Sequence, residues 1–141
     1  MTLVPSHFAQ QSRETGALAR IAVVGRGFTG MMTAIALLKT FDRPFHLVLH
    51  DPYPRIDGGE GIAHAASPLL NSRVRDLSID PILRDDFRAW LETDGRWDAG
   101  GQTGAAGAVD HAFVPREIFS AYVYQRFAEA LRGRTDVIMQ V

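Results

Sequence analysis

The pattern of apolar and polar residues changes sharply at residue 20. Residues 1–19 are polar and without periodicity, and we expect them to form a flexible N-terminal tail. Residues 21–24, Ile-Ala-Val-Val, then form a short apolar run that ends abruptly at Gly25. Because most of these side chains are β-branched, the run predicts a strand buried on both faces, as in a parallel sheet.

A helix and a second strand are predicted directly after this run. Residues 30–40 combine apolar positions with good helix formers, and the length of the segment favours a helix over a strand. The Asp-Arg-Pro sequence at 42–44 ends that helix, and residues 45–50 then alternate as a strand does. Strand, helix and strand within about 30 residues predict a βαβ unit with a right-handed crossover.

The second half of the chain predicts two more helices and a third strand. Asp80 and Pro81 have the residue types of an N-cap and a first helical position, which predicts a helix to about residue 92. This helix is expected to bury its apolar side chains, namely Ile82, Leu83, Phe87, Trp90 and Leu91. Pro115 is predicted to begin the next helix and Gly133 to end it, followed by a strand from residue 136. The glycine- and alanine-rich residues 93–112 predict an exposed, mobile loop.

The most informative motif is G-x-G-x-x-G at residues 25–30, between the first strand and the first helix. Gly25 permits a tight turn out of the strand, Gly27 lets a pyrophosphate approach the backbone, and Gly30 allows close packing of the helix. The backbone N–H groups of the first helical turn, beginning at Phe28 and Thr29, are expected to face the phosphates. The positive end of the helix dipole favours the negative charge of those phosphates.

An acidic residue stands where such a motif requires one. Asp51 ends the second predicted strand about 20 residues beyond the glycines, where a carboxylate accepts hydrogen bonds from both ribose hydroxyls. A carboxylate there would repel a 2′-phosphate, so the pattern favours FAD or NAD over NADP. Taken separately, the glycines are compatible with a plain turn and Asp51 with a solvated strand end; their register favours a dinucleotide site. Arg26 is expected to be exposed, with contact to a phosphate as the alternative.

Several further segments carry a resemblance to a known family. In chain order they are residues 51–52, 59–63, 68–74, 77–78, 87–91 and 113–119, with Leu69-Leu70-Asn71 and Phe113-Val114-Pro115-Arg116 as the more specific ones. The chain resembles, over about residues 20–132, the N-terminal part of the FAD/NAD(P)-binding flavoproteins, which are distant relatives of flavin monooxygenases and N-hydroxylases.

The resemblance implies an α/β fold of the Rossmann-like, three-layer type, with residues 20–141 as the N-terminal part of an incomplete FAD/NAD(P)-binding domain. It implies FAD held by the glycine loop and Asp51, with Pro52, Asn71 and Arg116 close to the cofactor. NAD(P) is expected only through a region beyond these residues. Asn71 is equally compatible with a turn, and Arg116 with a solvated charge in the first turn of a helix.

The chain also departs from the family pattern. Family members are longer, and His64 and Phe119 stand where the family has tyrosines. Substrate details are therefore not transferred. His64 is the one histidine expected near the flavin, although packing alone also accounts for it.

Composition mainly excludes functions. The chain has 141 residues, a formal net charge of -1 and no cysteine. Without a basic field, nucleic-acid binding has no electrostatic support. The lack of cysteine excludes thiolate metal sites and the flavoprotein disulfide reductases, and the histidines show no metal-ligand spacing. No apolar run is long enough to span a bilayer and no secretory signal is visible, so we expect a cytoplasmic protein without membrane contact.

Three hypotheses follow from these residues. The leading one is an FAD-binding oxidoreductase segment, part of a larger flavoprotein, whose isolated chain need not turn over. No catalytic residue is assigned, because a flavin performs the chemistry itself. The second is an NAD-dependent Rossmann dehydrogenase, although a third strand would then follow the second one sooner. The third is a noncatalytic nucleotide-binding or interaction subunit, in which a partner chain or self-association completes the sheet.

Overall fold

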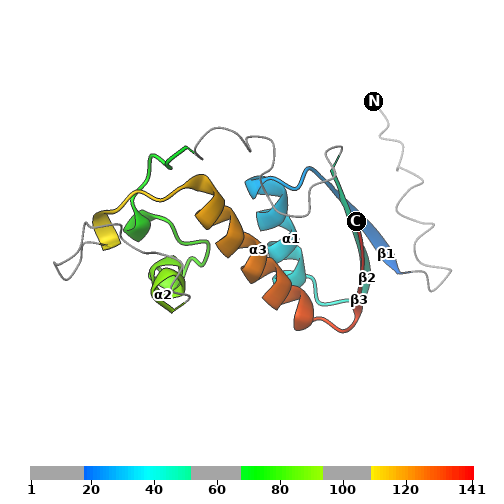
Figure 1. Ribbon diagram of the computed structural model, residues 1–141. Helices are drawn as coiled ribbons and strands as arrows, with labels where there is room; N and C mark the ends of the chain where they lie inside the picture. The colour runs from blue at the N-terminus through cyan, green and yellow to red at the C-terminus, as the bar shows by residue number, and fades with distance from the viewer. Residues whose placement is uncertain (1–17, 52–67, 94–108) are drawn as a thin grey trace, which may run out of the picture.

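The computed structural model describes residues 18–51, 68–93 and 109–141 (Figure 1). The elements in chain order are β1 (Ala19–Val24), α1 (Phe28–Thr40), β2 (Phe45–His50), η3 (Val74–Asp76), α2 (Asp86–Thr93), η4 (Val109–His111), α3 (Arg116–Arg132) and β3 (Val137–Gln140). The two η elements are single turns of 3-10 helix. Residues 1–17 of the predicted tail, Pro52, His64 and most of the predicted glycine-rich loop lie outside the described residues. Ala19, which the prediction assigned to the tail, is the first residue of β1.

The three strands form one parallel sheet in the order β1-β2-β3. Ala19 lies opposite Phe45, and Phe45 lies opposite Val137 on its other side. The helices α1 and α3 lie side by side against one face of this sheet (Figure 1). Two successive β-α-β crossovers confirm the predicted α/β, Rossmann-like fold, of which the described residues form the sheet and one helical layer.

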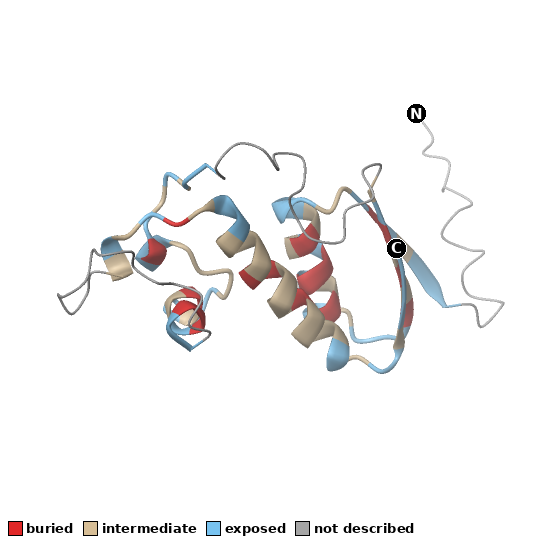
Figure 2. Ribbon diagram, in the orientation of Figure 1, coloured by how far each residue is buried: buried red, intermediate tan, exposed pale blue. Residues whose placement is uncertain are grey.

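One part of the core lies between the sheet and these two helices, and another part lies where α2 packs against α3. Alternate residues of β2, namely Phe45, Leu47 and Leu49, are buried on the helical side. Met31, Ala34, Ile35 and Leu38 are the buried residues of α1. Figure 2 shows the buried segments of α1 and of the sheet facing each other across this layer. This face carries most of the apolar burial that holds α1, β2 and α3 together.

The prediction that the first strand is buried on both faces is wrong for the described residues. Val23 is only 8% exposed, whereas its neighbour Val24 is 76% exposed. On β3, Ile138 is 54% exposed. It lies on the same side of the sheet as Val24, because Ile138 pairs with His46 and Val24 pairs with His50, two residues on the same face of β2. Among the described residues, no element covers this side of the sheet. The β-branched run at residues 21–24 therefore predicted the strand correctly, but not that one of its two faces is exposed.

The start of α2 also differs from the prediction. The Asp80 carboxylate accepts hydrogen bonds from the N–H groups of Ile82 and Leu83, at 2.9 and 3.0 Å, as an N-cap would. However, the Ser78 hydroxyl donates to the Leu83 carbonyl at 2.8 Å and closes a separate turn. The helix begins only at Asp86, and Ile82 and Leu83 are 85% and 60% exposed rather than buried. The predicted burial of Phe87, Trp90 and Leu91 is confirmed.

The other predicted boundaries agree closely. The strand at residues 45–50 is confirmed to the residue, and α3 begins directly after Pro115. Gly133 caps the C-terminal end of α3, and its N–H donates to the Glu129 carbonyl at 3.2 Å. Its φ is -73°, so this position does not require the left-handed conformation that glycine favours.

A single arginine ties the end of α1 to the turn between α3 and β3. The Arg134 guanidinium donates to the carbonyl oxygens of Leu38, Phe41 and Arg43, at 2.9, 2.6 and 3.1 Å. It also pairs with Asp136 at 2.7 Å. The last carbonyls of a helix have no partner within it, so Arg134 supplies donors that α1 lacks.

Candidate functional site

The glycine loop begins with a tight turn at the end of β1. Gly25 has a φ of +92°, a conformation that side chains other than glycine rarely adopt. Its N–H donates to the carbonyl of His50, the last residue of β2, at 2.7 Å. The loop is thereby fixed to the carboxyl edge of the sheet, where ligands of parallel α/β folds bind.

The other two glycines differ in what the protein itself requires of them. A Cβ on Gly30 would overlap the carbonyl oxygen of Gly25, so packing of α1 against the loop demands glycine there. A Cβ on Gly27 would meet no atom within 4 Å, and its φ of -69° suits any residue. Neither packing nor conformation accounts for glycine at 27. The space beside its backbone is open to a ligand.

The N-terminus of α1 is suited to an anion. Gly27 is the N-cap and offers no side-chain hydrogen bond to the first turn, and that turn contains no acidic residue. The first amide groups of a helix have no partner within the helix, and the macrodipole places a partial positive charge there. Phe28 and Thr29, the predicted phosphate-facing residues, are the first two residues of α1 and are exposed.

Asp51 lies against this loop. Its Oδ2 atom accepts a hydrogen bond from the Arg26 N–H at 3.0 Å, and the Arg26 Nε atom lies 3.9 Å from the same oxygen. The Arg26 and Asp51 side chains are only 8% and 19% exposed. The prediction of an exposed Arg26 is therefore wrong, because its guanidinium lies beside the Asp51 carboxylate instead of extending into solvent.

Helix α3 also contacts the loop, through a residue that the sequence did not single out. The Tyr124 hydroxyl donates to the carbonyl of Arg26 at 2.9 Å. Nearby, the ring centres of Phe28 and Phe119 lie 5.8 Å apart, so the first turns of α1 and α3 meet. Tyr124 is not among the apolar positions whose spacing predicted α3. The available signal in the sequence was a tyrosine directly after two of those positions, because a tyrosine that packs usually finds a hydrogen-bond partner for its hydroxyl.

Comparison with known proteins agrees with this geometry. A protein-family model described as FAD-NAD(P)-binding matches residues 22–140. The chain belongs to the FAD-NAD(P)-binding family. No match was found among curated proteins or among solved structures. The family match confirms the resemblance drawn from the sequence segments. It means that the ligand is a flavin or nicotinamide dinucleotide, a small molecule.

Two other predicted segments of this FAD-NAD(P)-binding domain are brought together. Leu69 and Pro115 form an antiparallel bridge, flanked by a hydrogen bond from the Leu70 N–H to the Val114 carbonyl at 2.9 Å. Asn71 and Arg116 follow these bridged residues, and both are exposed. Arg116 also begins α3, whose first turns meet those of α1. Their contact with a cofactor remains a prediction.

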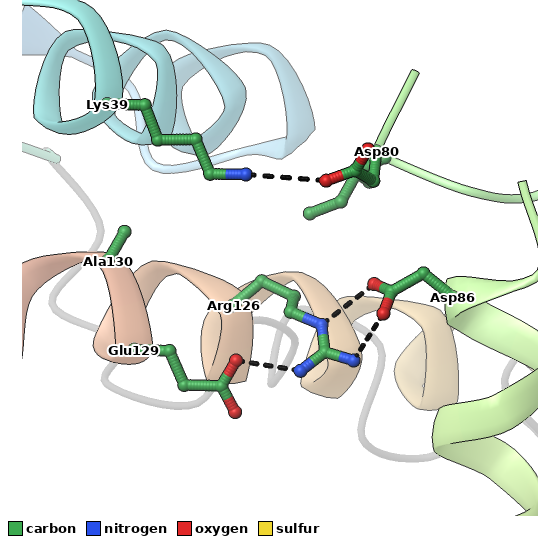
Figure 3. Close-up of a pocket in the computed structure, with 7 residues that line it drawn as sticks. Lys39, Asp80, Asp86, Arg126, Glu129 and Ala130 are labelled. Carbon is green, nitrogen blue, oxygen red and sulfur yellow. Dashed lines mark hydrogen bonds and ion pairs between the residues drawn. The ribbon is translucent and has the colours of Figure 1, made fainter. Parts of the chain in front are cut away.

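A polar cleft of about 220 Å³ lies at the other end of α1 (Figure 3). Lys39, near the C-terminus of α1, pairs there with Asp80 at 3.6 Å, and Arg126 pairs with Asp86 at 2.7 Å. The charged groups in this cleft satisfy each other. Because α1 begins at the glycine loop and ends here, the cleft is separate from the dinucleotide site.

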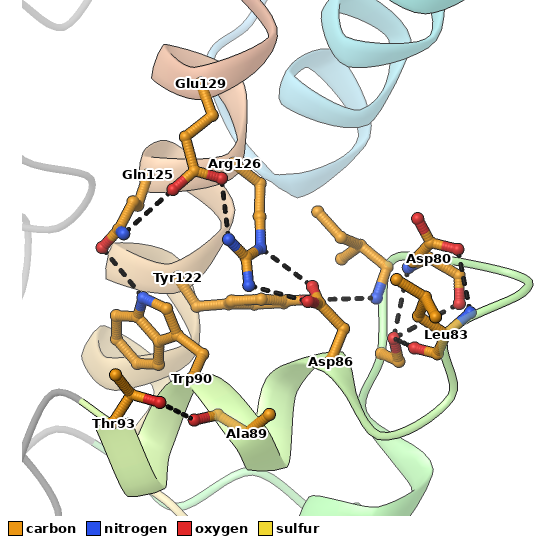
Figure 4. A network of polar contacts seen from close by, with 12 residues as sticks. Asp80, Leu83, Asp86, Ala89, Trp90, Thr93, Tyr122, Gln125, Arg126 and Glu129 are labelled. Atoms are coloured by element: carbon orange, nitrogen blue, oxygen red, sulfur yellow. Dashed lines mark hydrogen bonds and ion pairs between the residues drawn. The ribbon is translucent and has the colours of Figure 1, made fainter.

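The cleft borders a polar network that joins α2 to α3 (Figure 4). Arg126 makes two hydrogen bonds to Asp86, at 2.7 and 2.8 Å, and the Tyr122 hydroxyl donates to Asp86 at 2.6 Å. The Trp90 indole donates to Gln125 at 2.8 Å. Burial, followed by the hydrogen bond to Asp86, raises the pKa of Tyr122 to about 12. The hydrogen bond from Arg126 lowers the pKa of Glu129. These paired groups hold two helices together.

Neither a metal centre nor a membrane-spanning helix is found in the part of the chain that the structure describes. Within residues 18–51, 68–93 and 109–141, no cluster of three or more His, Asp or Glu side chains is arranged to hold a metal ion. In the same ranges, no helix has the length and apolarity needed to cross a membrane.

Proposed function

We propose that this domain binds FAD for an oxidoreductase reaction, with the pyrophosphate on the loop at residues 25–30 and the adenosine ribose on Asp51. The observation that carries the proposal is the open space beside Gly27, at an uncapped helix N-terminus, with a carboxylate turned toward the same loop. Few other ligands need a diphosphate-binding helix end and a ribose-binding carboxylate so close together.

Each part of the loop has a task in this proposal. The N–H groups at Phe28 and Thr29 bind phosphate oxygens, and the absence of a side chain at Gly27 lets those oxygens approach. Asp51 accepts hydrogen bonds from the ribose hydroxyls. Pro52, Asn71 and Arg116 are assigned to the cofactor only through the family resemblance. FAD supplies the redox chemistry when it is bound, and the residues of the loop and Asp51 hold and orient it.

Side-by-side titration of the purified chain with FAD, NAD and NADP tests this proposal. We expect FAD to bind most tightly and NADP most weakly, because Asp51 repels a 2′-phosphate. Asp51→Asn keeps an acceptor for the Arg26 N–H but loses the charge. It is expected to weaken FAD binding about tenfold, as loss of a charge-assisted hydrogen bond does. Binding of none of the three dinucleotides would refute the proposal.

The second candidate is an NAD-dependent dehydrogenase. The observation in its favour is the strand order, because β1, β2 and β3 are adjacent in the order of a mononucleotide-binding half of the Rossmann fold. That half is shared by NAD- and FAD-binding proteins, so strand order alone does not separate them. In the same titration, NAD binding more tightly than FAD would select this candidate.

We also propose that the side of the sheet that carries Val24 and Ile138, which no described element covers, promotes self-association, as expected of a noncatalytic or assembled subunit. The exposure of Val24 and Ile138 on that side supports this. Ile138→Lys should shift the protein toward monomer in sedimentation equilibrium, whereas Lys substituted at exposed Ile82 serves as the control. A monomeric wild-type protein at all concentrations would contradict it.

We further propose a cytoplasmic location, with which the lack of cysteine agrees.

A further inference from the structure

Tyr124 reaches the glycine loop from a distant part of the chain. It lies in α3, 98 positions beyond Arg26, and its hydroxyl donates to the Arg26 carbonyl at 2.9 Å. The ring is partly buried, so its position is set by packing as well as by the hydrogen bond. This contact joins α3 to the backbone of the loop itself, not merely to a side chain.

Both backbone groups of Arg26 are thereby fixed. The Arg26 carbonyl accepts from Tyr124, and the Arg26 N–H donates to Asp51 at 3.0 Å. The buried guanidinium lies beside the same carboxylate. Arg26 therefore links α3, the backbone of the loop and the Asp51 carboxylate through one residue.

The orientation of the next peptide group follows from this arrangement. Within the described residues every peptide bond is trans, so the Arg26 carbonyl and the Gly27 N–H point in opposite directions. Holding the carbonyl toward α3 therefore directs the Gly27 N–H away from α3. A glycine flanks this peptide, and glycine adopts positive and negative φ about equally readily, so without an anchor the peptide would reorient easily.

We propose that Tyr124 is a positioning residue for the dinucleotide, which fixes the peptide between Arg26 and Gly27 so that the Gly27 amide is presented to the diphosphate. This inference rests on the proposed function. Tyr124 itself touches no phosphate and acts only through the loop. Its effect is therefore expected on the affinity for the diphosphate-bearing half of the ligand.

The test compares two variants that each remove one hydroxyl from α3. Tyr124→Phe removes the donor to the loop, while Tyr122→Phe removes the donor to Asp86 in the separate network between α2 and α3. We expect Tyr124→Phe to raise the dissociation constants of both FAD and ADP about fivefold, in keeping with loss of one hydrogen bond. Tyr122→Phe should leave both constants within about twofold of wild type at a temperature where it is folded.

Hydrogen exchange of the unliganded protein gives a second readout. Tyr124→Phe should speed exchange of the amides at residues 26–30, and Tyr122→Phe should instead speed exchange in α2. Incorporation of 4-aminophenylalanine at position 124, which restores a donor, should recover both the affinity and the slow exchange. This variant also provides a measurement if Tyr124→Phe does not fold.

The outcomes separate the two claims. A wild-type chain that binds neither FAD nor ADP would overturn the proposed function and this inference with it. A wild-type chain that binds both, beside a Tyr124→Phe variant of unchanged affinity, would overturn the positioning role alone. Unchanged exchange at residues 26–30 in that variant would overturn it as well.

Discussion

At the scale of single residues, the three glycines of the loop carry different constraints. Gly25 is required by its positive φ and Gly30 by the nearby Gly25 carbonyl, so both are explained by the fold. Gly27 is explained by neither. A residue that is glycine without structural need, at a helix N-terminus, is the position where a ligand would require it.

This difference predicts opposite behaviour for two similar substitutions. Gly27→Ala should change the free energy of unfolding by less than about 1 kcal/mol, since the methyl group meets open space. It should nevertheless weaken FAD binding at least about tenfold, because the methyl group occupies the place of a phosphate oxygen. Gly30→Ala should destabilise the fold by about 1–3 kcal/mol through overpacking. Urea denaturation and FAD titration of both variants measure the two effects.

Equal loss of stability in both variants would contradict this division of roles. So would FAD affinity that is unchanged in Gly27→Ala, because the space beside that residue would then serve no ligand.

The sequence indicated some of these residues and missed others for a definable reason. The glycines and Asp51 occupy a local pattern with a known spacing, which can be recognised without a structure. The contact between Tyr124 and Arg26 joins residues 98 positions apart, and no spacing along the chain encodes it. The same applies to the pairing of Arg26 with Asp51, which depends on β1 and β2 ending side by side.

At the scale of elements, α2 is attached to α3 by a compact group of aromatic and charged side chains. Phe87, Trp90 and Tyr122 pack with ring centres 4.9 to 6.0 Å apart. Asp86 accepts hydrogen bonds from both Tyr122 and Arg126. Burial opposes the charge of Arg126, but its hydrogen bonds to Glu129 and Asp86 outweigh that penalty and raise its pKa overall.

Tyr122 gives this attachment a predictable dependence on pH. Its pKa is raised from 10.0 to about 12 in the folded protein, so the unfolded chain loses this proton first as the pH rises. Its contribution to stability is therefore complete below pH 10 and is lost as the pH rises through about 12. Below pH 10, Tyr122→Phe should be less stable by about 2 kcal/mol, the value of a hydrogen bond to a charged acceptor.

Urea denaturation of wild type and Tyr122→Phe at several pH values measures this difference. The gap between the two proteins should narrow as the pH rises above 10. A gap that stays constant up to pH 12 would show that the Tyr122 hydroxyl does not titrate in this way.

Arg134 provides a second link between elements, at the far end of α1. Arg134→Lys should lower the thermal midpoint, because one ammonium group cannot reach the carbonyls of Leu38, Phe41 and Arg43 while also pairing with Asp136. Arg132→Lys is the matched control, since Arg132 is exposed in the last turn of α3. Equal midpoints for the two variants would contradict the role given to Arg134.

The elements also show where sequence patterns are sufficient. Residues 45–50 alternate apart from Val48, and their alternate side chains are buried, so the strand was predicted to the residue. At α2 the predicted N-cap, Asp80, does bind two amide groups, but it does so within a turn. An aspartate side chain binds the following amide groups with the same local geometry in a helix N-cap and in a turn. The Ser78 hydrogen bond to the Leu83 carbonyl makes this segment a turn, and the residue pattern does not reveal that bond.

At the scale of the whole molecule, the parts of the proposed dinucleotide site lie together at one edge of the sheet. The loop after β1, Asp51 after β2, and the first turns of α1 and α3 all lie at the carboxyl ends of the strands. The polar cleft lies at the opposite end of α1 (Figure 3). A ligand bound at the first edge would contact several of these elements at once, and because it binds only the folded protein it should stabilise the fold.

Ligand-dependent stability tests this coupling. Free FAD at about one hundred times its dissociation constant should stabilise the native state by about 2.7 kcal/mol. The thermal midpoint should therefore rise with FAD concentration in wild type and rise clearly less at the same concentrations in Gly27→Ala, where binding about tenfold weaker leaves about 1.4 kcal/mol of stabilisation. A rise of equal size in that variant would place the binding site elsewhere.

The most direct measurement is a titration of the isotope-labelled chain with ADP, followed by the amide resonances in NMR spectra. We predict that the largest shifts fall on the amides of residues 26–31 and on Asp51, while Lys39, Asp80 and Glu129 in the polar cleft stay unchanged. Shifts concentrated in that cleft, or an absence of shifts in the glycine loop at saturating ADP, would contradict a dinucleotide site on that loop.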